Sequence, residues 1–407
     1  MTTAIPDTGT MQMLIGGELR PARSGAALEA VNPATGELLA LVPRASAEDV
    51  SDAVDAAQRA FPGWRATPPQ ERAERVLRLA QHLLDHGDEL AMLDVRDNGS
   101  PIREMLGDIS LAVSWIRHFA GMALHIRGET MQTGHDRVNY TLRAPYGVVG
   151  RIIPFNHPLM FATSKIAAPL IAGNTVVLKP SEDTSLSALA LAGALRELFP
   201  PGVVNIVTGT GAEAGDALVT HPGVRRLAFI GSPGTGRAIQ ARAASAAVKA
   251  VTLELGGKNP LVVFPDANLD EAVDGAVRGM NFTWQGQSCG STSRLLVHEG
   301  IHDEFVERLG ARIAELRSGD PSDPDTDTGA IVSAKQHEKV TSYIALGRQE
   351  GARLVCGGGP PEGEQFASGL FIRPTLFDRV RPDMRLAQEE IFGPVLAAIP
   401  FASYEEA

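Results

Sequence analysis

The stretch GVVGRIIPFNHPLMFATSKIAAPLIAGNTVVLKPSE, residues 147–182, holds two strand patterns separated by one helix pattern. Gly147–Ile153 and Thr175–Leu178 are runs of apolar, largely β-branched residues. Between them, Pro158–Ala172 carries apolar residues at helical spacing and is followed by Gly173, a common helix-ending residue. Because strands joined through a helix normally lie parallel, the stretch predicts a βαβ unit.

The alternation of strand and helix patterns continues to residue 253, and a second series follows. The pattern predicts, in chain order, the helix Ser187–Leu198, the strand Val203–Val207, the helix Ala212–Thr220, the strand Arg226–Ile230, the helix Gly236–Ala244 and the strand Lys249–Leu253. These elements predict a parallel sheet covered by helices on both faces, as in nucleotide-binding folds. A second α/β unit is expected after Gly257, with the strands Pro260–Phe264 and Arg294–His298, a helix from Asn268 towards Trp284 and the helix Ile301–Leu316.

The residues before the first βαβ unit carry three local signals. Ser46 and Asp49 have the spacing of a capping box, which predicts the start of a helix. His82 and His86 stand one helical turn apart but lack the intervening glutamate of a metalloprotease motif, so no metal site is predicted. Residues 128–143 include β-favouring side chains and predict a hairpin.

Composition excludes several classes of protein. The chain has 407 residues, enough for two or more domains, and a formal net charge of −11, which disfavours nucleic acid and anionic membranes as partners. No apolar run approaches the roughly 18 residues that span a bilayer. Met1–Thr10 lacks the basic and apolar regions of a signal peptide. With two cysteines at most one disulfide is possible, so we expect a reducing, cytoplasmic location.

A glycine-rich turn follows the strand expected at 226–230. Gly231–Ser232–Pro233–Gly234–Thr235–Gly236 would place backbone N–H groups and a helix N-terminus opposite a phosphate, although the spacing is not G-x-G-x-x-G. An ordinary tight turn is the alternative. Gly209, Gly211 and Gly215 follow another strand, and there we favour the simple turn.

A cation and an acid follow the strand expected at 175–178. Lys179 and Glu182 would stand at the carboxyl edge of the sheet, where open α/β sheets bind ligands. A carboxylate there accepts hydrogen bonds from ribose hydroxyls and repels a 2′-phosphate, which favours NAD over NADP. The alternative is a surface ion pair.

Three further positions carry groups that could take part in a reaction. Cys289 lies among small residues, and its thiolate is a good nucleophile if the site lowers its pKa or supplies a base. Glu254, at the end of a strand, would be that base if it protrudes into an interdomain cleft, or it is structural. For Lys258 we favour a structural ion pair. Asn156 is either the N-cap of the following helix or the donor to a developing oxyanion.

Six segments, in this order, resemble motifs of the NAD(P)-dependent aldehyde dehydrogenase superfamily. They are Pro154–Pro158, Lys179–Glu182, Gly231–Gly236, Glu254–Lys258, Gly286–Cys289 and Glu390–Pro394, and the likeness extends from about Met13 to Phe401. Each motif alone is weak evidence for this family, whereas the occurrence of all six in this order is very specific to it. The resemblance implies an α/β fold with a Rossmann-like cofactor domain and an α/β catalytic domain. It places residues 1–127 and 144–257 in the first, 258–407 in the second, and an oligomerisation hairpin at 128–143.

The resemblance also implies roles for individual residues. Cys289 would be the nucleophile, Glu254 the general base, Asn156 the oxyanion donor and Lys165 a lysine near the relay that serves the base. The implied cofactor is NAD, with NADP as the alternative. Its binding residues would be Lys179 and Glu182 at the adenosine ribose, Gly231, Ser232 and Gly236 at the pyrophosphate, Glu390 and Phe392 at the nicotinamide ribose and ring, together with Pro154 and Phe155. The implied partners are a small aldehyde and, as is usual in the family, further copies of the chain.

Two departures from the family pattern bear on function. Phe155 stands where the family usually has tryptophan, and His157 where an apolar residue is more common, so the mouth of the substrate pocket differs in polarity. Family members also continue well beyond Ala407, so the predicted catalytic domain is incomplete. The leading hypothesis is oxidation of an aldehyde to a carboxylic acid through a thiohemiacetal and a thioester of Cys289. The alternatives are a silent nucleotide-binding remnant and a thioester or ester hydrolase that uses Cys289 and Glu254.

Overall fold

The computed structural model describes residues 9–407, which form two compact units. Unit 1 comprises the residues up to Ala30 together with Leu39–Leu93 and Leu106–Glu254, and unit 2 comprises Val31–Leu38, Asp94–Met105 and Leu255–Ala407. The sequence-based division differs from these units at residues 255–257, next to the boundary, and at two short segments, Val31–Leu38 and Asp94–Met105; it had placed all of them in the cofactor domain. The sequence-based prediction for Met1–Thr10 concerns mainly residues 1–8, which lie outside the described residues.

Long-range contacts explain why these two segments join unit 2. In the segment Val31–Leu38, the carbonyl of Pro33 accepts a hydrogen bond from the Leu370 N–H, and Ala34 packs against Ala330 and Phe371. In the segment Asp94–Met105, the Ile102 N–H donates to the carbonyl of Pro321. Such partners lie more than 200 residues away in the sequence and leave no local pattern.

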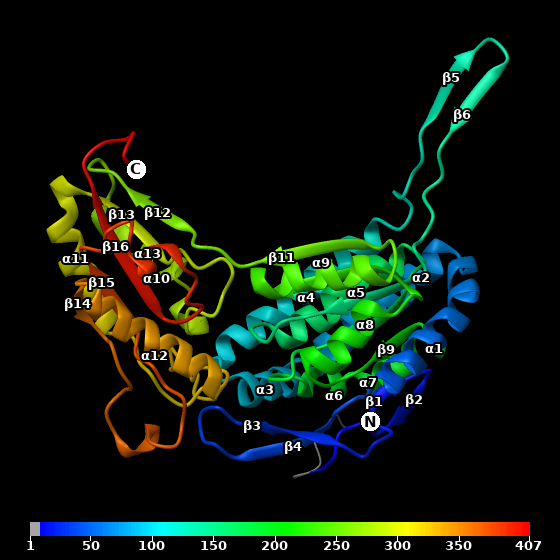
Figure 1. The fold of residues 1–407 in the computed structure, drawn as a ribbon, viewed down its shortest axis with the longest axis horizontal. Helices are drawn as coiled ribbons and strands as arrows, with labels where there is room; N and C mark the ends of the chain where they lie inside the picture. Colours follow the sequence, from blue (N-terminus) through cyan, green and yellow to red (C-terminus); the bar gives the residue numbers. More distant parts are fainter. Residues whose placement is uncertain (1–8) are drawn as a thin grey trace. The chain divides into compact units, whose positions relative to one another are not determined.

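Unit 1 is built on a seven-stranded sheet (Figure 1) with the strand order β11-β10-β7-β8-β9-β1-β2. The strands are β1 (Met13–Ile15), β2 (Glu18–Arg20), β7 (Val148–Ile152), β8 (Thr175–Lys179), β9 (Val204–Ile206), β10 (Val224–Gly231) and β11 (Ala250–Leu255). β10, β7, β8 and β9 pair in parallel, as predicted, whereas β1 pairs antiparallel with both β9 and β2. The sheet is therefore mixed at one edge.

The helices of unit 1 set the position of a crevice in this sheet. α5 (Pro158–Ile171) leads from β7 to β8, and α6 (Leu186–Ala190) with α7 (Ala192–Leu198) leads on to β9. The chain then returns through α8 (Asp216–Thr220) to β10 on the other side of β7, and α9 (Pro233–Ala246) follows. Right-handed crossovers place the two sets of helices on opposite faces of the sheet. The order of strands thus reverses between β7 and β10, where open α/β sheets form a ligand crevice at their carboxyl ends.

Three predicted helices are interrupted, shortened or partly of another helix type in the structure. The helix predicted at 187–198 is interrupted at Leu191, and the one predicted at 212–220 begins as the π-helix η1 (Gly211–Gly215). The helix predicted from Asn268 is α10 (Leu269–Gly279), because Asn281 takes a left-handed conformation with φ 53° before the short 3₁₀ helix η2 (Phe282–Trp284). Helical spacing of apolar side chains does not reveal such local changes of backbone geometry.

The remaining elements before β7 begin with two short strands. These are β3 (Ala27–Val31) and β4 (Leu38–Pro43), and four helices follow: α1 (Ala47–Ala66), α2 (Pro69–Asp85), α3 (Gly87–Asn98) and α4 (Ile102–Gly121). The capping box predicted at Ser46 and Asp49 is present at the start of α1. The predicted hairpin is β5 (Thr130–Gly134) and β6 (Arg137–Tyr140), and in Figure 1 it projects as a two-stranded ribbon from the rest of unit 1.

Unit 2 contains a five-stranded sheet in the order β12-β13-β16-β15-β14. Its strands are β12 (Pro260–Val263), β13 (Arg294–His298), β14 (Arg353–Cys356), β15 (Thr375–Asp378) and β16 (Val395–Phe401), and its other helices are α11 (Glu299–Ala314), α12 (Ala334–Gln349), η3 (Glu364–Phe366) and α13 (Arg385–Gln388). β14 alone pairs antiparallel. The last strand along the chain, β16, is the central strand of this sheet and is almost fully buried.

Two searches of residues 9–407 bear on membranes and metals. None of the helices there is long and apolar enough to cross a bilayer. The same residues contain no group of three or more histidine, cysteine, aspartate or glutamate side chains placed to hold a metal ion.

Candidate active site and cofactor pocket

A pocket of about 590 Å³ lies at the carboxyl ends of β7, β8 and β10 in unit 1. Its walls come from the segments that follow these strands, together with η1 and the adjoining helices. They include Ile153, Pro154, Phe155, Lys179, Glu182, Gly211, Gly215, Phe229, Gly231, Ser232, Thr235, Ile239 and Arg242. Its volume lies in the range of ordinary small-molecule sites, and it occupies the crevice at which the strand order reverses.

Lys179 and Glu182 form an ion pair in the wall of this pocket. The ammonium of Lys179 lies 3.2 Å from the Glu182 carboxylate and also donates to the Pro180 carbonyl. Because Lys179 is only 2% exposed, the surface ion pair considered from the sequence is wrong. Burial lowers the pKa of Lys179. Burial alone would raise the pKa of Glu182, but the charge of Lys179 and backbone hydrogen bonds hold it below its ordinary value. Glu182 is therefore an anionic acceptor at neutral pH.

The π-helix η1 lines the pocket beside this pair. The N–H of Gly211 donates to Glu182, and the Asp216 carboxylate that follows η1 accepts from Arg242 at 2.6 Å. Gly211–Gly215 forms a π-helix, where a simple turn was favoured from the sequence for Gly209, Gly211 and Gly215. A π-helical turn is rare and frequently marks functional sites.

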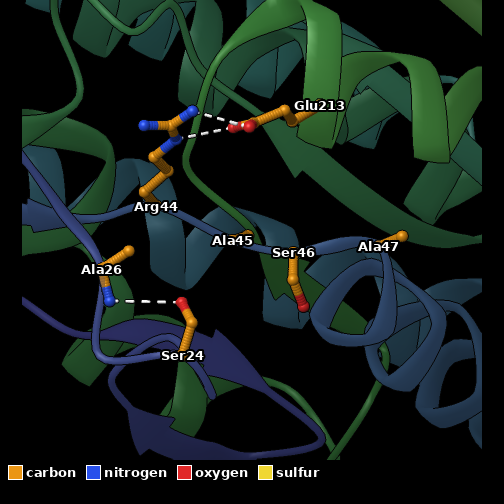
Figure 2. Close-up of a pocket in the computed structure, with 7 residues that line it drawn as sticks. All are labelled: Ser24, Ala26, Arg44, Ala45, Ser46, Ala47 and Glu213. Carbon is orange, nitrogen blue, oxygen red and sulfur yellow. Dashed lines mark hydrogen bonds and ion pairs between the residues drawn. The ribbon is translucent and has the colours of Figure 1, made fainter.

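A second cavity, of about 420 Å³, adjoins the other side of η1 at the start of α1 (Figure 2). There the guanidinium of Arg44 donates two hydrogen bonds of 2.6 Å to the carboxylate of Glu213, which belongs to η1. The hydroxyl of Ser46, in the same cavity, caps α1. Arg44 therefore ties the end of β4 to the segment that lines the larger pocket.

The glycine-rich turn leads directly into α9. Ser232 is the N-cap and accepts from the Thr235 N–H, and Pro233 occupies the first helical position, so α9 begins three residues earlier than predicted. The first turn of α9 carries no acidic side chain. A Cβ on Gly231 would lie 2.4 Å from the ring of Phe229, so the turn requires glycine there. The positive end of a 14-residue helix thus borders the pocket at Ser232 and suits an anionic ligand.

The segment between β7 and α5 does not have the N-cap that was considered from the sequence. The N-cap of α5 is His157, not Asn156, and its side chain does not cap the helix. The imidazole instead forms a 2.7 Å contact with the carboxylate of Asp108 on α4. Asn156 is buried, with 3% of its surface exposed. Lys165, two turns along α5, places its ammonium 5.3 Å from the ring centre of Phe161.

Cys289 belongs to unit 2 and lies in the loop between η2 and β13. Its carbonyl accepts a 2.8 Å hydrogen bond from the side chain of Asn259. Upstream, the buried side chains of Gln285 and Gln287 bond to one another, and Gln287 accepts from the Val332 N–H. These hydrogen bonds fix both ends of a loop whose Cys289 side chain is partly exposed.

Gly286 opens this loop and needs the conformational freedom of glycine. Its φ is 65°, and an added Cβ would lie 2.2 Å from the Gly393 carbonyl oxygen. We expect Gly286→Ala to lower the free energy of unfolding by about 2–3 kcal/mol, because positive φ and a backbone clash add together. Urea unfolding of the purified chain measures this. Gly290→Ala is the matched control, since its Cβ would meet only Ser288 Oγ at 3.7 Å; equal losses in both variants would contradict the prediction.

Glu254 and Lys258 flank the transition from β11 into unit 2. The Glu254 side chain, in unit 1, is exposed. The ion pair favoured for Lys258 is wrong: within residues 9–407 its buried ammonium has neither a hydrogen-bond partner nor a salt bridge, and the residue as a whole is half-buried. Burial, together with the nearby charge of Arg294, lowers the pKa of Lys258 to about 8.

Glu390 and Phe392 lie in unit 2, between α13 and β16. The Glu390 carboxylate accepts a 3.2 Å hydrogen bond from the Gly257 N–H, and burial raises its pKa. A Cβ on Gly256 would overlap this carboxylate. Phe392 adopts a positive φ of 59°, an uncommon conformation for phenylalanine, and its carbonyl accepts from Gln336.

The structure brings six of the nine predicted cofactor residues to one pocket. Pro154, Phe155, Lys179, Glu182, Gly231 and Ser232 all line it, whereas Gly236 is buried in α9 and does not. Sequence reasoning missed Thr235, Ile239 and Arg242 on α9. The sequence did contain a signal for these residues, because all three lie within three helical turns of the glycine-rich segment that begins α9.

Comparison with known proteins places this geometry in a family. Residues 20–407 match the family model described as the aldehyde dehydrogenase family. The chain belongs to the aldehyde dehydrogenase family. Aldehyde dehydrogenase tropH of Talaromyces stipitatus is 44% identical over 385 residues, which are 93% of this chain and 74% of that protein. Hydroxyisobutyraldehyde dehydrogenase of Mycolicibacterium austroafricanum is 43% identical over 97% of this chain and 78% of its own length.

Solved structures of aldehyde dehydrogenases share the fold. An aldehyde dehydrogenase from Bacillus cereus, solved as a complex with NAD⁺, superposes with a TM-score of 0.94 at 42% identity. The match covers 98% of this chain and 80% of that one. The chain is therefore an α/β protein of the aldehyde dehydrogenase fold and spans about four fifths of these relatives.

Proposed function

We propose that this chain oxidises a small aldehyde to a carboxylic acid with NAD, using Cys289 as the nucleophile. Membership of the family supports the reaction type, and the NAD⁺ complex of the Bacillus cereus relative supports the cofactor. The main support is the pocket in the crevice of unit 1. Glu182, an anionic hydrogen-bond acceptor, lines this pocket together with the N-terminus of α9, whose first turn carries no acidic side chain.

The residues of this pocket fit a dinucleotide. Glu182 would accept hydrogen bonds from the hydroxyls of the adenosine ribose, and buried Lys179 would hold that carboxylate in place. Ser232 and the N–H groups of the first turn of α9 would bind the pyrophosphate. Apolar Ile239 and Val219 line the remainder and suit a flat base. We assign Glu390 and Phe392 to the nicotinamide end by their match to the family motif.

Cys289 begins the proposed reaction. Its thiolate attacks the aldehyde carbon, a C–S bond forms, and the carbonyl oxygen becomes an oxyanion. The Asn156 side-chain amide and the Cys289 backbone N–H would donate hydrogen bonds to this oxyanion, and one such donor is typically worth about 3 kcal/mol. When bound, NAD⁺ supplies the acceptor for the hydrogen that leaves this carbon with its electron pair.

Glu254 completes the proposed reaction. The first half leaves a thioester on Cys289, which must be hydrolysed before another turnover. Glu254 would take a proton from a water molecule whose oxygen attacks the thioester carbon. The C–S bond then breaks, the acid leaves, and Cys289 returns as the thiolate. Lys165 would act through the relay that serves Glu254, as its match to the family lysine implies.

Turnover by the 407-residue chain tests the proposal. We expect NADH, followed at 340 nm, to form when the purified protein is given NAD and a panel of aliphatic, hydroxylated and aromatic aldehydes. NAD-dependent thermal stabilisation without turnover would instead support a nucleotide-binding protein without catalysis. Hydrolysis of thioesters that is indifferent to NAD but lost in Glu254→Gln would support the hydrolase.

Glu182 gives a prediction about the choice of cofactor. Glu182→Gln removes the charge that binds ribose hydroxyls and repels a 2′-phosphate. We expect the dissociation constant for NAD to rise about tenfold, corresponding to about 1.4 kcal/mol, and that for NADP to fall. Isothermal titration with both dinucleotides measures the change. Glu213→Gln removes a carboxylate that faces Arg44 on the far side of η1 and serves as the control. A parallel rise for both dinucleotides would refute the assignment of Glu182.

We also propose that the β5–β6 hairpin binds a second copy of the chain. Its strands expose Met131, Val138 and Tyr140, each by more than half of its surface, and Leu142 beyond the hairpin is 80% exposed. A two-stranded ribbon with such a surface gains stability when another copy covers it. Light scattering of the purified chain should give at least twice the monomer mass, and Val138→Asp should reduce it.

A further inference from the structure

The pocket of about 590 Å³ in unit 1 has an ion pair in its wall, formed by Asp216 and Arg242. Asp216 is the first residue of α8, and Arg242 lies on α9. The Nε atom of Arg242 is 2.6 Å from Asp216 Oδ1, and its Nη2 atom bonds to Oδ2. Both side chains line the pocket, and 35% of the Asp216 side chain and 55% of the Arg242 side chain are exposed. Both therefore offer polar surface to a ligand in the pocket.

The pair presents an acceptor and a donor side by side. A carboxylate has about four lone-pair positions and a guanidinium five N–H groups, and the hydrogen bonds between Asp216 and Arg242 occupy two of each. The hydrogen bonds from Arg242 hold the pKa of Asp216 below its ordinary value, although partial burial opposes this, so Asp216 is an anion at neutral pH. A bidentate contact also fixes the plane of the guanidinium. A ligand thus meets both groups in a defined arrangement.

The position of the pair along the pocket corresponds to the base of a dinucleotide. Ser232, assigned to the pyrophosphate, is the N-cap of α9, and Arg242 lies ten positions later, about 15 Å along the helix. Its side chain leans towards the N-terminus of α9, as helical side chains do, which shortens this separation. Glu182, assigned to the ribose, accepts from the Gly211 N–H, and η1 leads from Gly211 directly to Asp216. The adenine, which follows the ribose away from the pyrophosphate, therefore ends beside the pair.

We propose that the Asp216–Arg242 pair recognises the 6-amino edge of adenine and makes the pocket selective for adenine dinucleotides over 6-oxopurine dinucleotides. The inference rests on the proposed function, because it takes the ribose and the pyrophosphate to be held by Glu182 and Ser232. The 6-amino group donates to the Asp216 carboxylate, and the ring nitrogen beside it accepts from Arg242. Both residues contact the cofactor and take no part in the reaction of the aldehyde.

A 6-oxopurine reverses this pattern of donor and acceptor. Hypoxanthine has a carbonyl oxygen in place of the amino group, and its N1 carries a hydrogen. The carbonyl oxygen would face the Asp216 carboxylate, and neither group can donate a hydrogen bond to the other. The base cannot exchange the two positions, because its ribose and pyrophosphate are held elsewhere. Sites that bind a polar group of the ligand through hydrogen bonds reject analogues that lack it more strongly than apolar surfaces do.

The pair is a poor site for the 2′-phosphate of NADP. An arginine near the ribose accommodates that phosphate in some dinucleotide-binding proteins. Here Asp216 neutralises the charge of Arg242. Lys179 and Glu182, at the ribose, likewise form a neutral pair. These four side chains together carry no net charge to attract a phosphate, so the edge of the base is the better ligand for Arg242.

The test compares NAD with nicotinamide hypoxanthine dinucleotide, in which an oxygen replaces the 6-amino group. Isothermal titration of the purified chain measures both dissociation constants without turnover. The fraction of folded protein cancels in their ratio, because both ligands are titrated into the same preparation. We expect the wild-type chain to bind NAD about tenfold more tightly, or better.

Asp216→Asn separates recognition from a role in folding. The side-chain amide can accept from an amino group or donate to an oxygen, so the hypoxanthine dinucleotide should bind more tightly than to the wild type, and the two dissociation constants should come within about threefold of each other. A side chain that only shaped the pocket would weaken both ligands together when changed. Glu213→Gln is the matched control: it removes a carboxylate of η1 that faces Arg44 and does not line this pocket, and it should leave the ratio unchanged.

Arg242→Met removes the donor and keeps an apolar stem. It should weaken NAD and bring the ratio closer to one, whereas an equal loss for both ligands would mean that Arg242 only covers the face of the base, and would overturn the inference. Equal binding of both dinucleotides by the wild-type chain, or an unchanged ratio in Asp216→Asn, would overturn it as well, while the proposed function stands. If neither dinucleotide binds and no aldehyde is oxidised, the proposed function fails, and the inference falls with it.

Discussion

We expect Cys289→Ala to abolish NADH formation from every aldehyde that the wild-type chain oxidises, if Cys289 is the nucleophile that we propose. Without the sulfur no covalent intermediate forms, and the hydrogen would have to leave a planar carbonyl carbon. We expect kcat to fall by roughly 10⁴-fold or more, the range seen when a nucleophile is removed from other enzymes. Stopped-flow and steady-state assays at 340 nm measure the loss. The fold should remain intact, because the loop around Cys289 is held through its backbone and through Gln285 and Gln287.

The second cysteine of the chain provides the matched control. Cys356 lies at the end of β14, and burial raises the pKa of its thiol, so it is a poor nucleophile at neutral pH. Cys356→Ala should therefore keep turnover within about twofold of wild type. Mass spectrometry of protein quenched during turnover should find the acyl adduct on Cys289. Turnover that survives in Cys289→Ala, or an adduct on Cys356, would refute the assignment of the nucleophile.

Asp378→Ala lowers the free energy of unfolding of the chain by about 3 kcal/mol at pH 5.5. Asp378 ends β15, is fully buried, and its two oxygens lie 2.9 Å from His302 Nε2 and 2.7 Å from Arg353. The variant leaves His302 buried on α11 without its main counter-charge. Urea denaturation of both proteins, followed by tryptophan fluorescence, measures the difference.

The contribution of this cluster depends on pH in a defined window. Burial alone would raise the pKa of Asp378, but His302 and Arg353 lower it to about 2, so its contribution is present above its ordinary pKa of 3.8 and is lost as the pH falls towards 2. The Asp378 carboxylate raises the pKa of His302 above 6.5, although burial opposes this. The contribution of His302 is therefore present below pH 6.5 and is lost as the pH rises through its raised pKa. The difference between wild type and Asp378→Ala should be larger at pH 5.5 than at pH 8.5.

Asp303→Asn is the control for this second prediction. Asp303 also approaches His302, at 3.1 Å from Nδ1, but its side chain is 79% exposed. Water screens an exposed pair, so the expected loss is much smaller than that in Asp378→Ala. A loss in Asp303→Asn as large as that in Asp378→Ala would show that burial does not govern this cluster.

Local sequence patterns predicted the elements whose conformation depends on near neighbours. The strand expected at 294–298 has the observed bounds of β13, and the capping box at Ser46 is present, because strand alternation and capping involve residues at most four positions apart. The segment after β7 shows where this fails. The sequence predicted the start of α5 at Pro158, where it is observed, but offered Asn156 as a possible cap; the cap is His157, whose side chain binds Asp108, 49 positions earlier.

The amino-acid sequence by itself determined the α/β rhythm, the family, and the residue types available at the carboxyl ends of the strands. These follow from the period of the apolar side chains and from short motifs that can be read without knowing which strands are neighbours. Only the tertiary structure decided that Gly211–Gly215 winds as a π-helix held by Arg44, that Lys179 is buried beside Glu182, and that His157 faces Asp108. Each of these depends on a partner or on burial, both of which are set by how distant segments pack against one another, and packing leaves no signal in local spacing.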